Sequence, residues 1–398
     1  MAGDDTIRFS LYGTLGLTHD DNPNWIPVRD LSQRPRGQSS DSRVMDSRLG
    51  AQINVRLNDS VDLMVQAVLR KQVDSSPNSA LDWAFVNLHP MSTVDVRLGR
   101  VGYDVFLMSD HRNLGYVYPW VRPPIEFYGW VPMYSVNGGD IAYSLEEGSV
   151  HWRFKAQGGM AGLKFPMGKN GPDYYFRSSD VWSLTTERES GAWRTKLGYS
   201  QILIGPDAPI LEPLQAGLQQ VAGAGIPGVS GESSALLTQL TYKGVKLRYA
   251  NFGVAYDDGL WQGQAELGRV NTSADMVSNG TMAYVGVGRR FGDFTPFVLL
   301  SGIQSNNPVK QPVANWAPFG LSGLQATALS ALNSTRFHQE TASIGLRWDF
   351  SSHAALKAQW DSTHVHANGY GLWYQAAGAA VQNDAQVNLF SVTVDFIF

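Results

Sequence analysis

The side chains with the clearest chemical capacity lie in one stretch, residues 101–137, where aromatic rings, prolines and charges of both signs follow one another without a helical or strand-like period. Guanidinium and carboxylate groups sort solutes by charge, and aromatic faces pack on ring-shaped solutes, so this stretch offers non-covalent selection. An aperiodic loop of this length is usually functional. Its candidate residues are Tyr103, Asp104, Asp110, Arg112, Tyr116, Tyr118, Trp120, Arg122, Glu126 and Tyr128.

Patterns for covalent chemistry are weak. The eight histidines are dispersed, no Gly-x-Ser-x-Gly elbow is present, and no phosphate-binding glycine pattern joins a strand to a helix. His364 and His366 share one strand face with Asp361 nearby and could hold a metal, but no third ligand is evident, so a solvated rim is the preferred interpretation. The sequence therefore predicts no catalytic residue, no metal and no cofactor. A barrel enzyme stays open as an alternative from a different class.

Strands with a period of two flank the aromatic stretch. Residues 48–57 alternate apolar side chains with polar ones, and residues 61–70 resume the alternation after a tight turn at 58–60. The polar face of such strands repeatedly carries basic residues. Closure of a barrel would bring its last strands beside its first, so these residues could form one positive flank. The basic wall predicted in this way consists of Arg8, Arg48, Arg56, Arg70, Arg97, Arg347 and Lys357.

Two environments produce this alternation, a soluble sandwich and a membrane barrel with a polar lumen. The lengths of the connections distinguish them, because short and long loops alternate along the chain. Short turns on one side of a membrane and long loops on the other side give this pattern in an outer-membrane barrel. The short connections are 58–60, 90–92, 146–148, 187–191, 257–259, 292–293 and 351–352, and the long ones are 19–43, 101–137, 160–175, 205–244, 305–335 and 367–385.

Counting up-and-down strands gives sixteen, an even number as single-chain bacterial barrels require. The segment 234–242 also alternates but would spoil the parity, so it is assigned to a loop. Segments 212–221 and 321–332 have the apolar spacing of short amphipathic helices. The predicted strands are 7–18, 44–57, 61–72, 80–89, 93–100, 138–146, 149–159, 176–187, 191–203, 245–257, 260–271, 279–291, 294–304, 336–350, 353–366 and 386–398.

Composition agrees with one all-β unit over residues 1–398. Cysteine is absent, which excludes a disulfide scaffold, and no apolar run is long enough for a transmembrane helix. A formal net charge of −4 with no basic tract argues against nucleic acid as a partner. No secretory signal peptide is present, and Met1–Asp4 looks like an initiator methionine placed before an already processed N-terminus.

Several segments carry a resemblance to a known family. The chain ends in an alternating strand, VNLFSVTVDFIF, which resembles the terminal signature of bacterial outer-membrane barrels. The internal stretches RLGR, YPWVRPPIEFYGW, YDDGLWQGQAELGRV and FGDFTPFVLL resemble proteobacterial porin-like proteins. The resemblance implies a sixteen-stranded transmembrane antiparallel β-barrel, commonly a homotrimer, whose third outer loop folds into the lumen as the constriction. The second outer loop, 73–79, departs from the pattern because it is short, whereas in trimeric general porins it often contacts a neighbour.

Together these features predict an outer-membrane porin of a Gram-negative bacterium, with outer-membrane lipid, lipopolysaccharide and small hydrophilic solutes as its partners. Solutes would diffuse passively through a lumen narrowed by residues 101–137, and the basic wall facing loop carboxylates would favour anionic or zwitterionic solutes. Alternatively, the arginines pair with Asp62, Asp95, Asp349, Asp361 and loop carboxylates. A second alternative is a substrate-selective channel that stacks an aromatic or sugar solute, or holds a small organic acid, at the constriction. The soluble sandwich would be a carbohydrate-binding protein.

Overall fold

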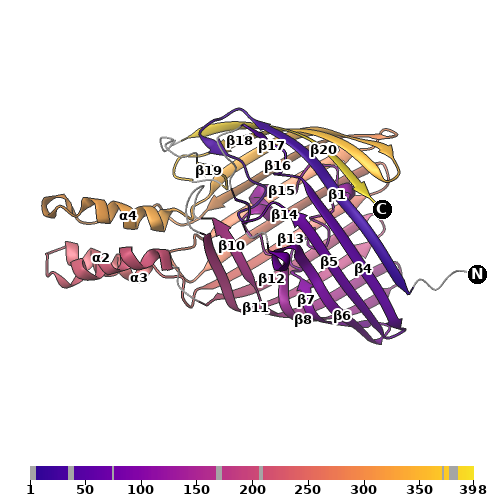
Figure 1. Ribbon diagram of the computed structural model, residues 1–398, viewed down its shortest axis with the longest axis horizontal. Helices are drawn as coiled ribbons and strands as arrows, with labels where there is room; N and C mark the ends of the chain where they lie inside the picture. Colours follow the sequence, from indigo (N-terminus) through magenta and orange to yellow (C-terminus); the bar gives the residue numbers. More distant parts are fainter. Residues whose placement is uncertain are drawn as a thin grey trace, which may run out of the picture.

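The fold is a closed antiparallel β-barrel of sixteen long strands, seen in a computed structural model (Figure 1). The structure describes residues 6–34, 40–73, 76–166, 173–205, 209–369, 372–375 and 384–398. The expectation for Met1–Asp4 therefore lies outside the described residues. The predicted fold class and the strand count are confirmed.

Each long strand pairs with its neighbours along the chain, and β1 closes the barrel by pairing with both β4 and β20. Tyr12 of β1 lies opposite Gly50 on one side and Ile397 on the other. The barrel strands are β1 (Ile7–Asp20), β4 (Arg48–Asn58), β5 (Val61–Arg70), β6 (Leu81–Met91), β7 (Val94–Gly102), β8 (Ser135–Glu147), β9 (Val150–Met160), β11 (Asp173–Ser190), β12 (Trp193–Ile204), β13 (Lys246–Asp257), β14 (Trp261–Thr272), β15 (Gly280–Arg289), β16 (Phe294–Ser305), β17 (His338–Ser351), β18 (Ala354–Val365) and β20 (Ala385–Ile397).

Shorter elements extend the barrel at the end where the long loops lie. β10 (Gly162–Pro166) pairs with the first residues of β11, and β3 (Asp41–Ser42) pairs with the end of β1. β2 (Trp25–Ile26) pairs with β19 (Tyr374–Gln375), which joins the first and last long loops. A single helical turn, α1 (Pro77–Ala80), precedes β6.

The outer surface of the barrel is apolar. Leucine side chains such as Leu15, Leu197 and Leu267 are more than half exposed, while their strand neighbours of opposite parity are buried. Exposed apolar side chains on alternate positions all around a closed barrel are expected where the surrounding medium is lipid. This arrangement excludes the soluble sandwich, whose apolar faces would pack against each other.

The two ends of the barrel differ. Short turns join the strands at one end, where Gly148 and Gly191 have φ angles of 61° and 57°, a left-handed conformation that glycine adopts without steric cost. The long loops and all longer helices lie at the other end, on the left of Figure 1.

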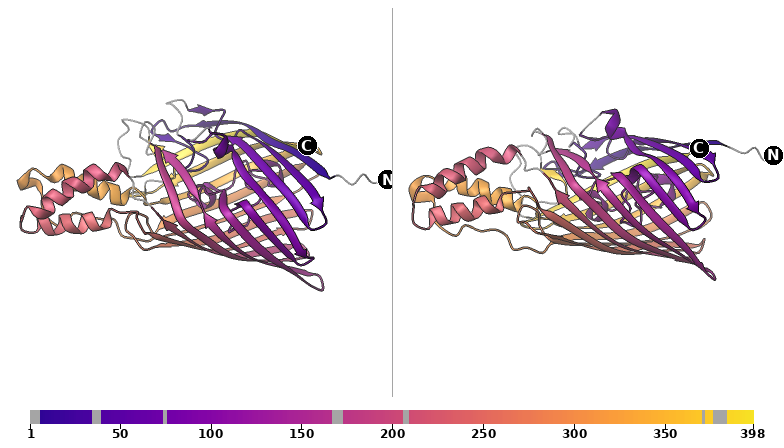
Figure 2. Two further views of the ribbon diagram at one scale, coloured as in Figure 1. Left: turned by 60° about the horizontal axis from the view of Figure 1, so that its bottom comes forward. Right: turned by 90° about the horizontal axis from the view of Figure 1, so that it is seen from below.

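Three helices project together beyond the long-loop end (Figure 2). They are α2 (Glu212–Gly223), α3 (Val229–Gln239) and α4 (Ser322–Asn333), so the two predicted loop helices are confirmed and 234–242 is not a strand. The Glu232 carboxylate ties α3 to the loop before α4, because it accepts hydrogen bonds from the backbone N–H groups of Val313 and Ala314 and from Trp316 Nε1. Among the described helices, none has the length and apolar character needed to cross a membrane.

Candidate functional site

Residues 103–134, between β7 and β8, cross the interior of the barrel. Inward side chains of the last strands bind their backbone: Lys357 Nζ donates to the Gly115 and Trp120 carbonyl oxygens at 2.6 and 3.0 Å, and Gln359 Oε1 accepts from the Val121 N–H. Two irregular helical turns, Gly115–Val117 and Ile125–Gly129, interrupt the segment. Because buried backbone groups need partners, these wall side chains fix the course of an otherwise aperiodic chain.

Most aromatic side chains of this segment are used in packing. Phe106 lies 6.0 Å from Tyr103 and 5.4 Å from Tyr128 between ring centroids, and all three are buried against Tyr249 and Tyr284 from the barrel wall. Tyr118 and Trp120 are also buried and stack on each other. The rings suggested for stacking a solute therefore contact other protein rings.

Tyr116 differs from these buried rings because it is only half-buried. Its hydroxyl donates to the Ser352 carbonyl oxygen at 2.8 Å, in a short turn, and its ring lies 4.8 Å from the Arg347 guanidinium. Arg347 also donates to the Tyr116 and Tyr118 carbonyl oxygens. These contacts hold the loop against the last strands at the short-turn end.

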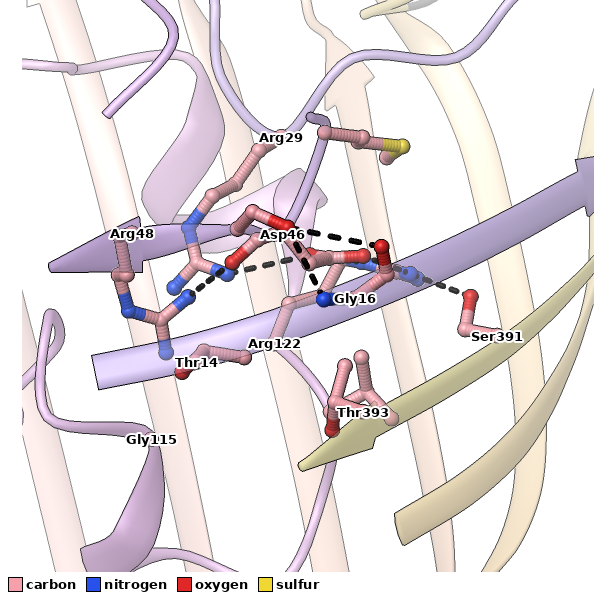
Figure 3. Close-up of polar contacts among 12 residues, drawn as sticks. Thr14, Gly16, Arg29, Asp46, Arg48, Gly115, Arg122, Ser391 and Thr393 are labelled. Atoms are coloured by element: carbon pink, nitrogen blue, oxygen red, sulfur yellow. Dashed lines mark hydrogen bonds and ion pairs between the residues drawn. The ribbon is translucent and has the colours of Figure 1, made fainter. Parts of the chain in front are cut away.

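Three arginines surround the buried carboxylate of Asp46 (Figure 3). Arg122 Nη2 and Arg29 Nη1 lie 2.7 and 3.2 Å from its oxygens, and Arg48 Nη1 donates to its backbone carbonyl. Arg122 also pairs with Asp361 at 2.6 Å. Burial favours the neutral acid, but the guanidinium groups of Arg122 and Arg29 outweigh burial, so the pKa of Asp46 lies below its ordinary value.

The carboxylates of residues 103–134, called the inner segment below, contact different parts of the barrel wall. Asp104 forms ion pairs with Lys155 of β9 and Lys196 of β12. Glu126 accepts hydrogen bonds at 2.6 to 2.7 Å from Ser301, Gln339 and Thr341 on β16 and β17. Asp110 is exposed and lines a cavity at the short-turn end.

The predicted basic wall faces the interior, but most of its members are paired. Arg70 lies 2.9 Å from Asp82, Arg97 2.8 Å from Asp140, and Lys357 3.0 Å from Asp395. Arg347 pairs with Asp349 at 2.6 Å, whereas Arg56 and Asp62 approach only to 3.9 Å. Arg8 is exposed at the short-turn end.

Arg48 and Arg112 differ from these pairs. Arg48 donates to the Asn113 carbonyl oxygen at 2.6 Å and to the Tyr118 hydroxyl at 3.0 Å, and Arg112 donates to the Met133 carbonyl oxygen. Among the described residues, no side-chain carboxylate lies within ion-pair distance of either guanidinium. Both side chains are buried, so each contributes a positive charge that no direct ion pair cancels.

A layer made of Arg70, Tyr134 and Arg112 separates two cavities. The two guanidinium carbons lie 3.9 and 3.6 Å from the centroid of the Tyr134 ring, on which both stack. The Tyr134 hydroxyl donates to Asp30 at 2.8 Å, and Asp82 binds Arg70 from the side. We call Arg70, Tyr134 and Arg112 the arginine–tyrosine layer.

Each cavity opens toward one end of the barrel. A cavity of about 150 Å³ toward the long loops is lined by Arg70, Arg100 and Asn137, and one of about 190 Å³ toward the short turns is lined by Gln66, Asp110 and Arg112. Tyr134 and Asp82 line both cavities. The layer is therefore one side chain thick between the two cavities.

Sequence reasoning missed several residues of this interior. Asp82, Lys155, Lys196 and Glu266 occupy inward positions of strands, so strand parity carried a signal for them. Arg29 and Asp30 belong to the aperiodic first long loop, and Tyr134 follows the last turn of the inner segment, so no periodic signal marked these three. Asp46 fell within the predicted strand 44–57, but β4 begins only at Arg48, so Asp46 belongs to the loop.

Comparison with known proteins supplies the fold class. No family model matches the sequence, and no curated protein is significantly similar to it. Solved structures do match: an anion-selective porin from Comamonas acidovorans has a TM-score of 0.55 and 13% identity, covering 98% of this chain and 100% of that one. OmpF from Salmonella typhi, in complex with daunomycin, gives 0.55 and 12%, covering 99% of each chain. The chain is a porin-like β-barrel.

A third match is the outer membrane channel DcaP of Acinetobacter baumannii, with a TM-score of 0.51, 10% identity, and coverage of 100% of this chain and 99% of that one. Full coverage in both directions means that the whole porin-like barrel is shared, not one segment of it. The apolar outer face, together with the fold shared with outer-membrane channels, indicates a barrel of the bacterial outer membrane.

Proposed function

We propose that this porin-like barrel is a channel for passive diffusion of small hydrophilic solutes, that residues 101–137 form its constriction, and that its narrowest part is the arginine–tyrosine layer. The observation that carries the proposal is the pair of cavities that meet Tyr134 and Asp82 from opposite ends of the barrel. A sixteen-stranded barrel encloses an aqueous lumen, and the inner segment occupies much of it. The geometry of the described residues supports neither a nucleophile nor a catalytic base, so we propose no enzyme activity.

The charges at the layer favour anions. Arg70 is neutralised by Asp82, but Arg112 lines the cavity toward the short turns and has no direct ion pair among the described residues. An uncancelled positive charge at a narrow point raises the local concentration of anions and repels cations. Small anionic or zwitterionic solutes are therefore the proposed substrates.

Changing Arg112 to Gln tests the charge preference. The Arg112→Gln channel is expected to shift its reversal potential in a salt gradient toward cations, with an anion-to-cation permeability ratio about twofold lower, because one constriction charge is lost. Arg248→Gln is the matched control, because it removes the same charge from the outward-facing side of β13. Equal reversal potentials for both variants and the wild type would refute the role of Arg112.

A second candidate function is a channel that selects organic anions with an apolar group. An apolar cavity of about 190 Å³, lined by Trp130, Phe337 and Leu163 among others, lies near the outer mouth. It shares Pro132 and Met133 with the polar cavity toward the long loops, which Arg70 and Arg100 line. An aromatic or aliphatic carboxylate could place its apolar part in one cavity and its charge in the other.

This candidate predicts that benzoate blocks the chloride current in a concentration-dependent way and that acetate, with the same charge, does not. Phe337→Ala should weaken the block, because it removes one wall of the apolar cavity. Identical effects of benzoate and acetate on the wild type would leave the general diffusion channel as the better account.

We also propose that the barrel assembles as a homotrimer in contact with outer-membrane lipid and lipopolysaccharide. The apolar outer face supports the lipid contact. The segment around α1 binds its own barrel, since Arg100 donates to the Asn78 side chain and carbonyl oxygen. We therefore place the trimer contacts on the barrel wall, and a monomeric mass in mild detergent would argue against the trimer.

A further inference from the structure

A compact group of histidines and carboxylates lies outside the lumen, at the long-loop end of β17 and β18. In the antiparallel register Glu340 is opposite His364, and the His366 N–H donates to the His338 carbonyl oxygen. Their strand neighbours Gln339 and Val365 are buried toward the interior, so all four side chains share the outer face. The group forms a block of two positions on each strand.

The donor atoms in this block converge. His366 Nε2 lies 3.1 Å and His364 Nδ1 lies 3.9 Å from Glu340 Oε1, and one donor atom from each of the three residues lies within 4.8 Å of the others. Zinc bonds of about 2.0 to 2.2 Å in a tetrahedral site place neighbouring donors about 3.3 Å apart. The distances from the two histidines to Glu340 are close to this spacing, and the histidine donors lie within 4.8 Å of each other, so side-chain rotations can bring all three donors onto one ion.

The surroundings hold the ligands in suitable orientations. Asp384 Oδ1 lies 2.8 Å from His364 Nε2, and a hydrogen bond there puts the proton on Nε2 and leaves the Nδ1 lone pair directed at Glu340. The His338 ring stacks on the His366 ring with centroids 4.0 Å apart. A carboxylate behind a ligating histidine is the usual second layer of a zinc site.

We propose that Glu340, His364 and His366 form a binding site for a first-row divalent metal ion, Zn²⁺ in particular, at the outer rim of the barrel. Two imidazoles and one carboxylate suit zinc, and an all-oxygen ligand set would be expected for calcium or magnesium. Bound zinc cross-links β17 to β18, and through Asp384 it also orders the chain just before β20. The fourth coordination position faces outward and is filled by water or by His338 after rotation of its ring.

The site is independent of the proposed channel function. It uses no residue that faces the lumen, and its test does not require conduction. The positions of its ligands along the chain explain why the sequence did not predict a metal site here. His364 and His366 are visible as a pair in the sequence, but the third ligand lies on another strand and is brought opposite His364 only by the register.

The test measures zinc bound to the purified full chain, made without a histidine tag and stripped with EDTA, by equilibrium dialysis against ZnCl₂ and by calorimetry. The wild type is expected to bind one zinc per chain, with at least tenfold weaker binding in His366→Ala and in Glu340→Gln. His151→Ala is the matched control, because His151 pairs with a single carboxylate, Glu146, at the opposite end of the barrel. CaCl₂ is expected to bind far more weakly than ZnCl₂.

Several results would overturn the site. These are no zinc binding by the wild type, equal binding by the wild type and His366→Ala, or an equal loss of binding in His151→Ala. Heat-modified mobility on a gel checks that each variant is folded, and Glu340→Gln, which keeps the side-chain shape, separates loss of a ligand from loss of structure.

Discussion

Replacing residues 110–129 with a flexible linker is expected to raise single-channel conductance several-fold. This part of the inner segment contributes Trp120, Phe127 and Tyr128, which are buried inside the barrel, and Arg122, which crosses to the first long loop and the last strands. Without it a sixteen-stranded barrel encloses an open aqueous lumen. A glycine–serine linker of about ten residues is flexible enough to rejoin the ends. Planar-bilayer recording in symmetric salt measures the effect.

The matched control replaces the hairpin of α2 and α3 with the same linker. That hairpin lies beyond the end of the barrel (Figure 2), so its loss should leave conductance close to the wild-type value. The strands carry the barrel hydrogen bonds, so both variants should still fold, which heat-modified gel mobility checks. A folded 110–129 variant with unchanged conductance would mean that another part of the chain limits the current.

Changing Asp46 to Asn is expected to destabilise the inner segment strongly. Asp46 is the buried carboxylate between Arg29 and Arg122, and its replacement leaves the two guanidinium groups close together with no negative charge between them. Breaking a buried ion pair typically costs about 3–5 kcal/mol, and water entering the lumen would bring the loss toward the lower value. Arg122 keeps its ion pair with Asp361, but the interior loses one negative charge, so anion preference should also increase. Unfolding in urea, followed by gel mobility, and the reversal potential measure the two effects.

The pH dependence has a definite sign. The pKa of Asp46 is lowered in the folded state, so its contribution to stability is fully present above the pKa of the unfolded chain and is lost as the pH falls toward the lower folded value. The wild type should therefore lose more stability on acidification than Asp46→Asn does. Asp59→Asn, in an exposed short turn, is the control. If Asp46→Asn were as stable as Asp59→Asn, the buried cluster would not anchor the inner segment.

The barrel could be predicted because the side chains of its strands alternate with a period of two. Alternation fixes which side chains face lipid, and the short turns fix where strands end; the predicted strand 294–304 became Phe294–Ser305 and 191–203 became Trp193–Ile204. The requirement for an even number of strands correctly excluded the segment 234–242 from the strands. This segment has strand-like alternation but lies largely in α3 and the chain that follows it. Helix spacing sufficed for α2 and α4.

The interior was harder because partners depend on register and on aperiodic chain. Parity pointed Arg97 inward, but only the pairing of β7 with β8 places Asp140 opposite it. Asp46 and Arg29 lie in a loop whose course is set by the inner segment it contacts, so no local pattern predicts them. The aromatic residues were recognised in the sequence, but composition alone cannot distinguish rings that pack on each other from rings that face a solute.

The most direct test of the account is the reversal potential of the wild-type protein in a planar bilayer under a potassium chloride gradient. The account predicts discrete ohmic steps and a reversal potential displaced toward the chloride equilibrium potential, because Arg112 holds a positive charge at the arginine–tyrosine layer that no direct ion pair among the described residues cancels. Steps with a potential displaced toward potassium, or a folded protein that conducts no ions, would contradict it.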